Sequence, residues 1–209
     1  NVARVSIAVA DWLNENKDHP SVVIGHDCRF AGELFAETAA KVLASKGVLV
    51  KLAKGFVSTP MVSLGVVNEK ASLGVVITAS HNPPSYNGYK LKGDFGGPLL
   101  PDDITAVENK IPDTNSVDYN AISMQDLVDE GKVVYVDLED MYCKHAEANF
   151  DLESIRNSGM HFAYDAMFGA GMNAVKRLLP NATLLHCDDN PGFLGTAPEP
   201  IHRNLQEFS

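Results

Sequence analysis

Cysteine and long apolar segments are both scarce in this chain. Its three cysteines, Cys28, Cys143 and Cys187, are widely spaced and odd in number, so they do not form the framework of a disulfide-stabilised domain. Such usage favours a reducing compartment, and we expect the cytoplasm. No apolar stretch approaches the roughly 20 residues that cross a bilayer, and the sequence does not open with the basic and apolar regions of a signal peptide. We therefore expect no association with a membrane.

Basic side chains are also in the minority. The sequence has 17 Lys and Arg against 27 Asp and Glu, which gives a formal net charge of −10. This excess of negative charge argues against a broad surface that binds nucleic acid. A local phosphate site is still compatible with it, because a few cations and backbone N–H groups are enough to bind one phosphate. With 209 residues, 45% of them hydrophobic, the chain can build one large domain or two small ones.

The apolar pattern predicts alternating strands and helices along the first part of the chain. Apolar residues at helical spacing predict a helix over residues 30–45, which Gly47 ends, and Thr59 is expected to cap a short helix that begins at Pro60. Alternation of this kind with short turns is typical of a layered α/β domain. The strands are predicted at residues 22–25, 48–52, 71–78, 89–91 and 132–138, and the helices at residues 2–13, 30–45, 60–67, 102–110 and 123–130.

A second unit of the same type follows. Helices are predicted over residues 140–150, 152–157 and 172–179, and strands over residues 160–165 and 182–186. We place the domain boundary near residue 138, so that residues 1–138 form the first domain and residues 139–209 form part of a second. Because Asn1 and Ser209 both fall within predicted helices, we expect this chain to be a piece of a longer protein.

The strongest candidate for chemistry is Ser80, in the segment Thr-Ala-Ser-His-Asn-Pro at residues 78–83. The segment follows the apolar strand that ends near Ile77, and a strand end fixes a serine while the turn exposes its oxygen. The alternative is an ordinary serine in a turn or helix cap. From its chemistry alone the two interpretations have equal weight.

Two neighbours of Ser80 have similar alternatives. His81 has the chemistry of a base, an acid or a phosphate donor, or it is a hydrogen-bonded loop histidine. Lys90 can donate to a phosphate, or act as a base if desolvation lowers its pKa, or it is an exposed strand lysine. Gly169 and Gly171 precede a predicted helix, where they either cradle a phosphate or form a tight turn for packing, which we prefer.

Several segments together resemble the α-D-phosphohexomutases, the family that includes phosphoglucomutases and phosphomannomutases. The hexapeptide at residues 78–83 is similar to the phosphoserine loop of that family. The other matching segments, in chain order, are Gly-His-Asp-Cys-Arg at 25–29, Ser-Thr-Pro at 58–60, Asn-Gly-Tyr-Lys at 87–90, Gly-Gly-Pro at 96–98, Asp-Ala-Met-Phe-Gly-Ala-Gly at 165–171, and Pro-Glu-Pro at 198–200 with Asn-Leu at 204–205. The resemblance covers the chain from about residue 20 to its end.

The resemblance implies a fold and a chemistry. The fold is an α/β/α layered domain with a mixed sheet, followed by part of a second similar domain. The activity is transfer of a phosphoryl group between the 1- and 6-positions of a hexose phosphate, through a phosphoserine and a bisphosphorylated sugar. Ser80 matches the phosphorylated serine, which as a dianion also calls for Mg²⁺, and an activator of the glucose 1,6-bisphosphate type is expected.

The resemblance also implies roles for other residues. Arg29 matches an arginine near the phosphoserine that is suited to pairing oxygens bidentately, the alternative being a surface arginine at a helix start. Lys90 matches an acid–base lysine, and His81 flanks the serine in a position to orient the phosphate or substrate. Substrate contacts are expected from Asn82, Tyr89 and Thr59.

Four family segments do not occur in this sequence. They are the Asp-Gly-Asp-x-Asp-Arg loop that binds Mg²⁺, the Gly-Glu-x-Ser-Gly loop that selects the sugar, the C-terminal phosphate-binding loop, and the Gly-Thr-Ser/Ala-Gly-x-Arg-Gly segment near the family's N-terminus. We therefore expect Ser80, as phosphoserine, to be the metal ligand in this chain, and the chain alone to lack turnover. Two rival hypotheses remain: a sugar-phosphate phosphatase that releases phosphate to water, and a mutase-like binding protein without catalysis.

Overall fold

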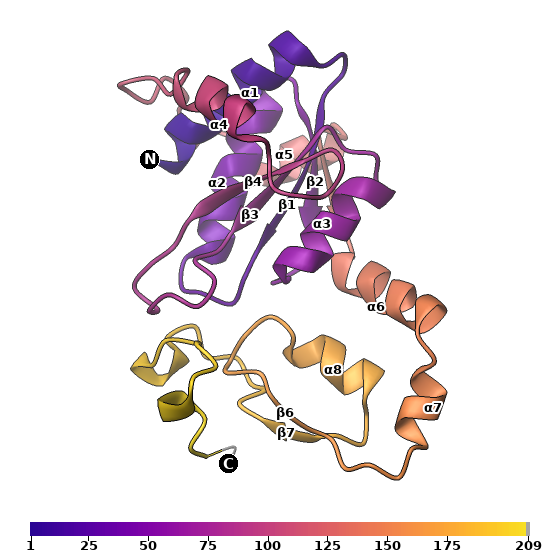
Figure 1. Ribbon diagram of the computed structural model, residues 1–209. Coiled ribbons are helices and arrows are strands. Elements are labelled where there is room, and N and C mark those ends of the chain that lie inside the picture. Colours follow the sequence, from indigo (N-terminus) through magenta and orange to yellow (C-terminus); the bar gives the residue numbers. More distant parts are fainter. Residues whose placement is uncertain (208–209) are drawn as a thin grey trace.

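The structure is a computed structural model that describes residues 1–207, and the helix expected at Ser209 lies outside the described residues. A five-stranded sheet with helices on both faces is joined to a smaller unit with a two-stranded sheet (Figure 1). No helix among residues 1–207 is both long and apolar enough to cross a bilayer. The strands are β1 Ser21–His26, β2 Leu49–Ala53, β3 Leu73–Ile77, β4 Tyr89–Gly93, β5 Val133–Val136, β6 Ala163–Asp165 and β7 Thr183–Leu185. The α-helices are α1 Val2–Asn16, α2 Gly32–Ser45, α3 Thr59–Asn68, α4 Pro101–Glu108, α5 Met124–Asp129, α6 Leu138–Asn149, α7 Leu152–Arg156 and α8 Met172–Leu178.

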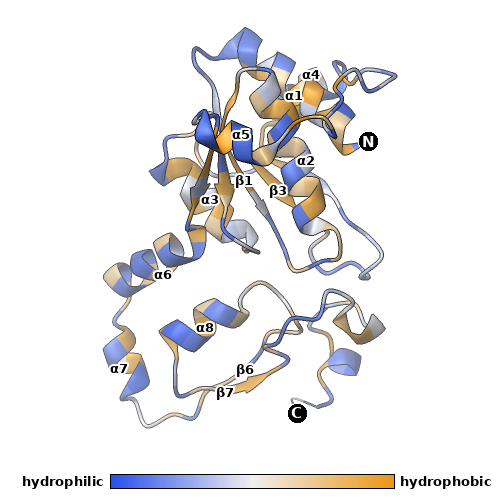
Figure 2. Ribbon diagram, turned by 180° about the vertical axis from the view of Figure 1, so that it is seen from behind, coloured by the Kyte–Doolittle hydropathy of each residue, from blue (hydrophilic) through white to orange (hydrophobic). Residues whose placement is uncertain are grey.

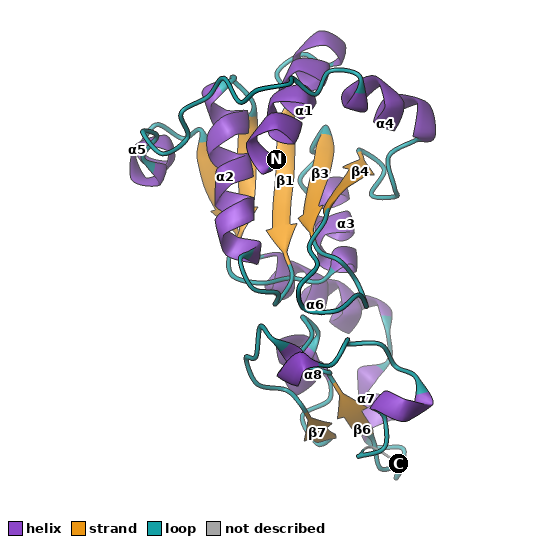
Figure 3. Cartoon of the chain, turned by 90° about the vertical axis from the view of Figure 1, so that its left-hand side faces the viewer, coloured by secondary structure: helices purple, strands orange, loops and turns teal. Residues whose placement is uncertain are grey.

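The large sheet has the strand order β4-β3-β1-β2-β5, and only β4 runs antiparallel to its neighbour. The central strands β1 and β3 are almost entirely buried, as expected for parallel strands that are covered on both faces. Helices α1 and α2 pack on one face, and α3 and α6 lie on the other (Figure 3). The expected α/β fold with a mixed sheet is confirmed.

The strands of the large sheet are coloured mainly as hydrophobic, whereas its helices carry both hydrophobic and hydrophilic residues (Figure 2). One cluster joins the sheet to α1 and α2, and a second joins it to α3 and α6. The second cluster continues into the small unit through Ala174 and Leu178 of α8. Arg177 of α8 also pairs with Asp140 and Glu147 of α6, both at 2.8 Å. Helix α6 therefore connects the two parts of the chain.

Helix α3 corrects one prediction from the sequence. Its cap is Ser58, which is extended (φ −81°, ψ 160°), and Thr59 already lies inside the helix. The expected strand over residues 132–138 likewise ends at Val136, because the side chain of Asp137 accepts a hydrogen bond from the Asp140 N–H at 3.0 Å and starts α6 at Leu138. In both cases a side chain just before the helix decides where it begins.

Gly25 of β1 packs against two valines more closely than any other residue could. A Cβ atom there would lie 2.5 Å from Val57 Cγ2 and 2.6 Å from Val62 Cγ2. Since overpacking a dense core costs about 1–3 kcal/mol, we expect Gly25→Ala to lower the free energy of unfolding by that amount in urea denaturation. The control is Gly192→Ala, where the nearest atom is Asn190 Oδ1 at 3.6 Å. Equal stabilities of the two variants would contradict this account.

Candidate active site

The loops that follow β1 and β3 meet at one edge of the sheet. His26 is in register with Ile77, so both strands end at the same level. The chain goes from β1 to β2 on one side and then crosses back to β3 on the other, which makes the β1–β3 boundary a topological switch point. Ligands of open α/β sheets bind in the crevice outside the carboxyl ends of the strands at such a point. The fold therefore places Arg29 and Ser80 where a ligand site is expected.

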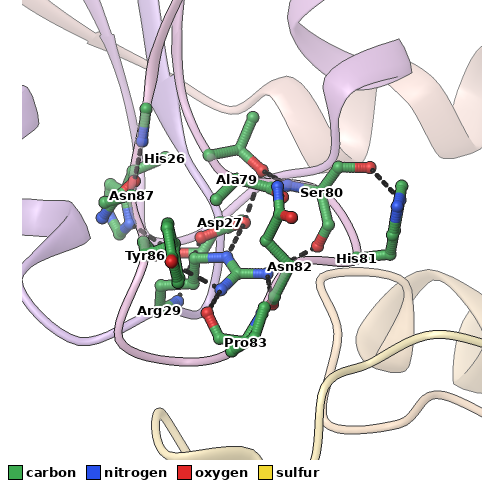
Figure 4. Close-up of polar contacts among 12 residues, drawn as sticks. His26, Asp27, Arg29, Ala79, Ser80, His81, Asn82, Pro83, Tyr86 and Asn87 are labelled. Carbon is green, nitrogen blue, oxygen red and sulfur yellow. Dashed lines mark hydrogen bonds and ion pairs between the residues drawn. The ribbon is translucent and has the colours of Figure 1, made fainter.

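Ser80 is exposed and held in a left-handed backbone conformation with φ 57°. Its N–H donates to Thr78 Oγ1 at 3.0 Å, and that hydroxyl donates in turn to Asp27 Oδ2 at 2.5 Å (Figure 4). Such a conformation costs a non-glycine residue on the order of 1–2 kcal/mol, so the surrounding hydrogen bonds are needed to hold it. The result is a serine whose backbone is fixed and whose hydroxyl faces solvent.

The Arg29 side chain holds residues 80–86 of this loop through hydrogen bonds. It is fully buried, and each of its five N–H donors has an acceptor. The Nε group donates to Asp27 Oδ2 at 3.2 Å. The other four bonds go to backbone carbonyls of Ser80 at 2.6 Å, Asn82 at 2.8 Å, Pro83 at 2.8 Å and Tyr86 at 3.3 Å (Figure 4).

This arrangement settles one alternative for Arg29 and changes its expected role. The interpretation of Arg29 as a surface arginine is wrong, because the residue is only 3% exposed. The sequence led us to expect that the N–H donors of Arg29 pair with phosphate oxygens, but all of them bond to Asp27 and to backbone carbonyls. Arg29 therefore holds the loop directly, and its charge lies within hydrogen-bond distance of the Ser80 carbonyl.

Asp27 and Thr78 belong to this network, and the sequence alone assigned neither of them a role. Asp27 accepts from the Arg29 N–H at 3.1 Å, from Arg29 Nε and from Thr78 Oγ1. The spacing of Asp27 and Arg29 was a usable signal, since an aspartate often accepts from the backbone N–H two residues on. The link to Thr78 spans 51 residues of sequence and no local pattern predicts it.

His81 and Asn82 lie beside Ser80, as expected from their place in the sequence. His81 is exposed, and its Nδ1 lies 3.4 Å from Ser80 Oγ, close enough to exchange a proton with the hydroxyl or to donate to a phosphate on it. Asn82 uses its side-chain amide to donate to the Ala79 carbonyl at 2.9 Å, which tightens the turn. Ser80 and His81 are therefore neighbours on the exposed side of this loop.

Lys90, Tyr89 and Thr59 line a cavity that the structure places apart from the Ser80 hydroxyl, with none of the loop residues 78–88 in its lining. Lys90 is exposed on β4 opposite Val76, and this cavity of about 570 Å³ lies at the outer edge of the sheet. The Tyr89 hydroxyl turns inward to Ser6 Oγ at 3.1 Å, and burial raises its pKa above the ordinary range. Within residues 1–207, no hydrogen bond or ion pair links Lys90 to Ser80.

Cys28 lies between the two network residues of the β1 loop, yet it is not a competing nucleophile. The residue is buried, and burial, together with the charge of Asp27, raises the pKa of its thiol to about 12. Since the thiolate is the reactive form, this cysteine stays protonated and inert at neutral pH. Ser80 is left as the exposed candidate nucleophile of the site.

The small unit approaches the site from the other side. Phe193 places its ring over the Arg29 guanidinium, with 5.1 Å between Arg29 Cζ and the ring centroid. Further away, the Asp165 carboxylate accepts from His186 Nδ1 at 2.9 Å and thereby raises the pKa of His186. Gly171 serves packing, since a Cβ there would overlap the Tyr164 hydroxyl. The turn at residues 168–171 thus fits the packing interpretation.

The residues present do not by themselves form a magnesium site. No group of three or more His, Cys, Asp or Glu side chains gathers anywhere in residues 1–207 in a way that would hold a metal ion. The nearest carboxylate to Ser80 along the network, Asp27, already accepts three hydrogen bonds. Ser80 is the one candidate metal ligand that this loop offers among the described residues.

Comparisons with known proteins agree with this arrangement. Residues 1–118 match the model of phosphoglucomutase/phosphomannomutase alpha/beta/alpha domain I, and residues 140–209 match domain II of the same family. A phosphoglucomutase of Staphylococcus saprophyticus is 36% identical over 145 residues, covering 66% of this chain and 25% of the relative. A phosphoglucomutase of Staphylococcus haemolyticus is 31% identical over 202 residues, covering 92% of this chain and 36% of the relative.

A solved structure is similar along nearly the whole chain. The crystal structure assigned to a phosphomannomutase of Thermus thermophilus superposes with a TM-score of 0.86 at 32% sequence identity. It matches 99% of this chain and 46% of its own length. The chain thus spans less than half the length of the proteins it resembles here.

Proposed function

The chain belongs to the phosphoglucomutase/phosphomannomutase family, and we propose that the protein carrying it moves a phosphoryl group between the 1- and 6-hydroxyls of a hexose phosphate through Ser80. One observation supports this most directly: Ser80 is an exposed hydroxyl in a strained conformation, on a loop that four donors of Arg29 hold at a topological switch point. Phosphoryl transfer depends mainly on positioning and on charge stabilisation, and this loop supplies both.

The proposed reaction has two balanced transfers. In the first, the bond between phosphorus and Ser80 Oγ breaks as a sugar hydroxyl attacks, so the sugar becomes a bisphosphate and the hydroxyl proton is lost to a base. In the second, Ser80 Oγ takes the other phosphoryl group back, and the released sugar oxygen gains a proton. The serine ends each cycle phosphorylated, so no co-substrate is consumed.

Roles for the residues follow from where they lie. Arg29 positions the loop and supplies charge. His81, with Nδ1 at 3.4 Å from Ser80 Oγ, exchanges the serine proton or orients the phosphate. We propose Lys90 as the acid–base group because it lies in the Asn-Gly-Tyr-Lys motif at residues 87–90. Since Lys90 is exposed on β4, the sugar would have to extend along this edge of the large sheet. Asn82 shapes the turn and contacts substrate.

Magnesium and a glucose 1,6-bisphosphate type of activator belong to the same proposal. The phosphoserine dianion would be a ligand of Mg²⁺, which stabilises charge on a transferring phosphoryl group. A bisphosphorylated sugar is the species that charges an unphosphorylated serine. Among residues 1–207, no group of three or more His, Cys, Asp or Glu side chains is placed to complete such a site.

Intact-mass spectrometry tests this function. We expect the protein that carries this chain to gain one phosphate when it is incubated with Mg²⁺ and glucose 1,6-bisphosphate, and peptide mapping to place it on Ser80. A protein that gains none would contradict the proposal. Phosphate release to water without exchange of glucose 1-phosphate and glucose 6-phosphate would favour the phosphatase instead.

A further inference from the structure

The contact between Arg29 and Phe193 links the serine loop to the second domain. Arg29 belongs to the loop after β1, whereas Phe193 lies in the short helix Phe193–Gly195. In Figure 1 this C-terminal segment, drawn in yellow, lies directly below the loop after β3. The Phe193 ring is 4% exposed and its centroid lies 5.1 Å from Arg29 Cζ, a distance at which the ring face attracts a cation.

An apolar cluster surrounds this contact and keeps it dry. Phe193 packs with Cys28 and Phe168, together with Met172 of α8 and the half-buried Phe56 after β2. The cluster therefore draws residues from both domains. All five N–H donors around the edge of the guanidinium group bond to loop carbonyls and Asp27, and the Phe193 ring covers a face of the group.

The backbone around Phe193 is strained in a way that favours a defined position of the ring. Phe193 and Leu194 both have left-handed backbones, with φ 49° and 51°. Three backbone hydrogen bonds hold the turn: Phe193 N–H to the Asn190 carbonyl at 3.0 Å, Gly195 N–H to the Gly192 carbonyl at 2.7 Å, and Thr196 N–H to the Phe193 carbonyl at 3.0 Å. Strain of this kind persists only where surrounding contacts determine it, and the buried ring is the contact that this turn delivers.

We propose that Phe193 is a positioning residue for Ser80: from the second domain it covers the Arg29 guanidinium, so that the order of the serine loop depends on where the second domain lies. When Phe193 is in place, Arg29 has no water to bind and donates only to the loop and Asp27. When the second domain moves away, water competes for the same donors and the loop carbonyls lose their partner. The consequence for catalysis rests on the proposed function, whereas the coupling itself does not.

Hydrogen exchange read by mass spectrometry tests the coupling in the protein that carries this chain. We expect the amides of residues 78–88 to exchange about tenfold faster in Phe193→Ala, as loss of a desolvated cation–π contact implies. Phe193→Leu keeps the apolar packing but removes the ring face, so we expect its exchange to be intermediate between that of the native protein and that of Phe193→Ala. Phe193→Trp keeps an aromatic ring, so we expect exchange close to that of the native protein. The control is Leu194→Ala, since Leu194 is 71% exposed.

Two further readings separate positioning from a general loss of structure. Amides of β1 and β3 report global unfolding, and we expect them to stay protected in Phe193→Leu. The Arg29 Nε–H signal in NMR spectra should be slow to exchange with water in the native protein and fast in Phe193→Ala. Exchange of residues 78–88 that is equal in Phe193→Leu and in Leu194→Ala would overturn the proposal. The same comparison can be made in protein that carries Ser80→Ala and therefore cannot be phosphorylated at this position. Faster exchange on adding Phe193→Ala there would support the coupling even if Ser80 never accepts phosphate, so failure of the proposed function is recognised separately.

Discussion

Replacing Ser80 with alanine is expected to abolish the interconversion of glucose 1-phosphate and glucose 6-phosphate by the protein that carries this chain. Without Oγ there is no atom to hold the phosphoryl group between the two transfers, and the buried thiol of Cys28 does not replace it. Loss of a covalent nucleophile costs at least about 10⁴-fold in kcat. A coupled assay of glucose 6-phosphate formation with Mg²⁺ and glucose 1,6-bisphosphate measures the loss.

The control for this prediction is Ser85→Ala, because Ser85 is an exposed serine in the same loop. The Ser80 side chain is exposed, and Ser80 joins the loop network through its backbone N–H and carbonyl, so Ser80→Ala should leave the free energy of unfolding nearly unchanged. Activity lost in Ser80→Ala but kept in Ser85→Ala identifies the carrier. Equal activity of Ser80→Ala and the native protein would contradict the proposed mechanism.

The sequence was sufficient to predict the layered fold because the signals for it are local. The buried strands β1 and β3 are continuous apolar runs, and α2 carries apolar residues at helical spacing before Gly47. The mixed sheet came from the family resemblance, since nothing in the five residues of β4 says in which direction they pair. The exact helix starts were missed where a single capping side chain, Ser58 or Asp137, decided them.

The candidate site was predicted less completely, for a physical reason. The sequence indicated that Ser80 is exposed and near His81, because these are neighbours along the chain. It did not reveal that Arg29 donates to carbonyls 51 to 57 residues away, since every residue type offers the same carbonyl. The inward turn of the Tyr89 hydroxyl and the cover by Phe193 also depend on tertiary packing that no spacing encodes.

The saturated hydrogen bonding of Arg29 leads to the second large prediction. Arg29→Ala would remove the side-chain donor to four backbone carbonyls and to Asp27, beneath an apolar cluster. Removing one partner of a buried ion pair costs about 3–5 kcal/mol. We expect a loss of unfolding free energy near the lower end of that range, because the Asp27 side chain keeps 16% exposure. Urea denaturation measures it, and the loop amides of residues 78–88 should exchange faster than those of β3.

Arg29→Lys tells hydrogen bonding apart from charge. A lysine keeps the positive charge but has three donors in place of five, so at least two of the five acceptors stay unmatched and the planar contact with Phe193 is lost. If charge alone mattered, Arg29→Lys would keep both stability and turnover. If the fork of donors holds the loop, as the geometry indicates, Arg29→Lys should lose more than half of the stability that Arg29→Ala loses. Arg203→Ala, at an arginine whose side chain is 75% exposed, should change stability by no more than about 0.5 kcal/mol. A loss as large at Arg203 as at Arg29 would show that removal of any arginine, rather than the buried network, destabilises the protein.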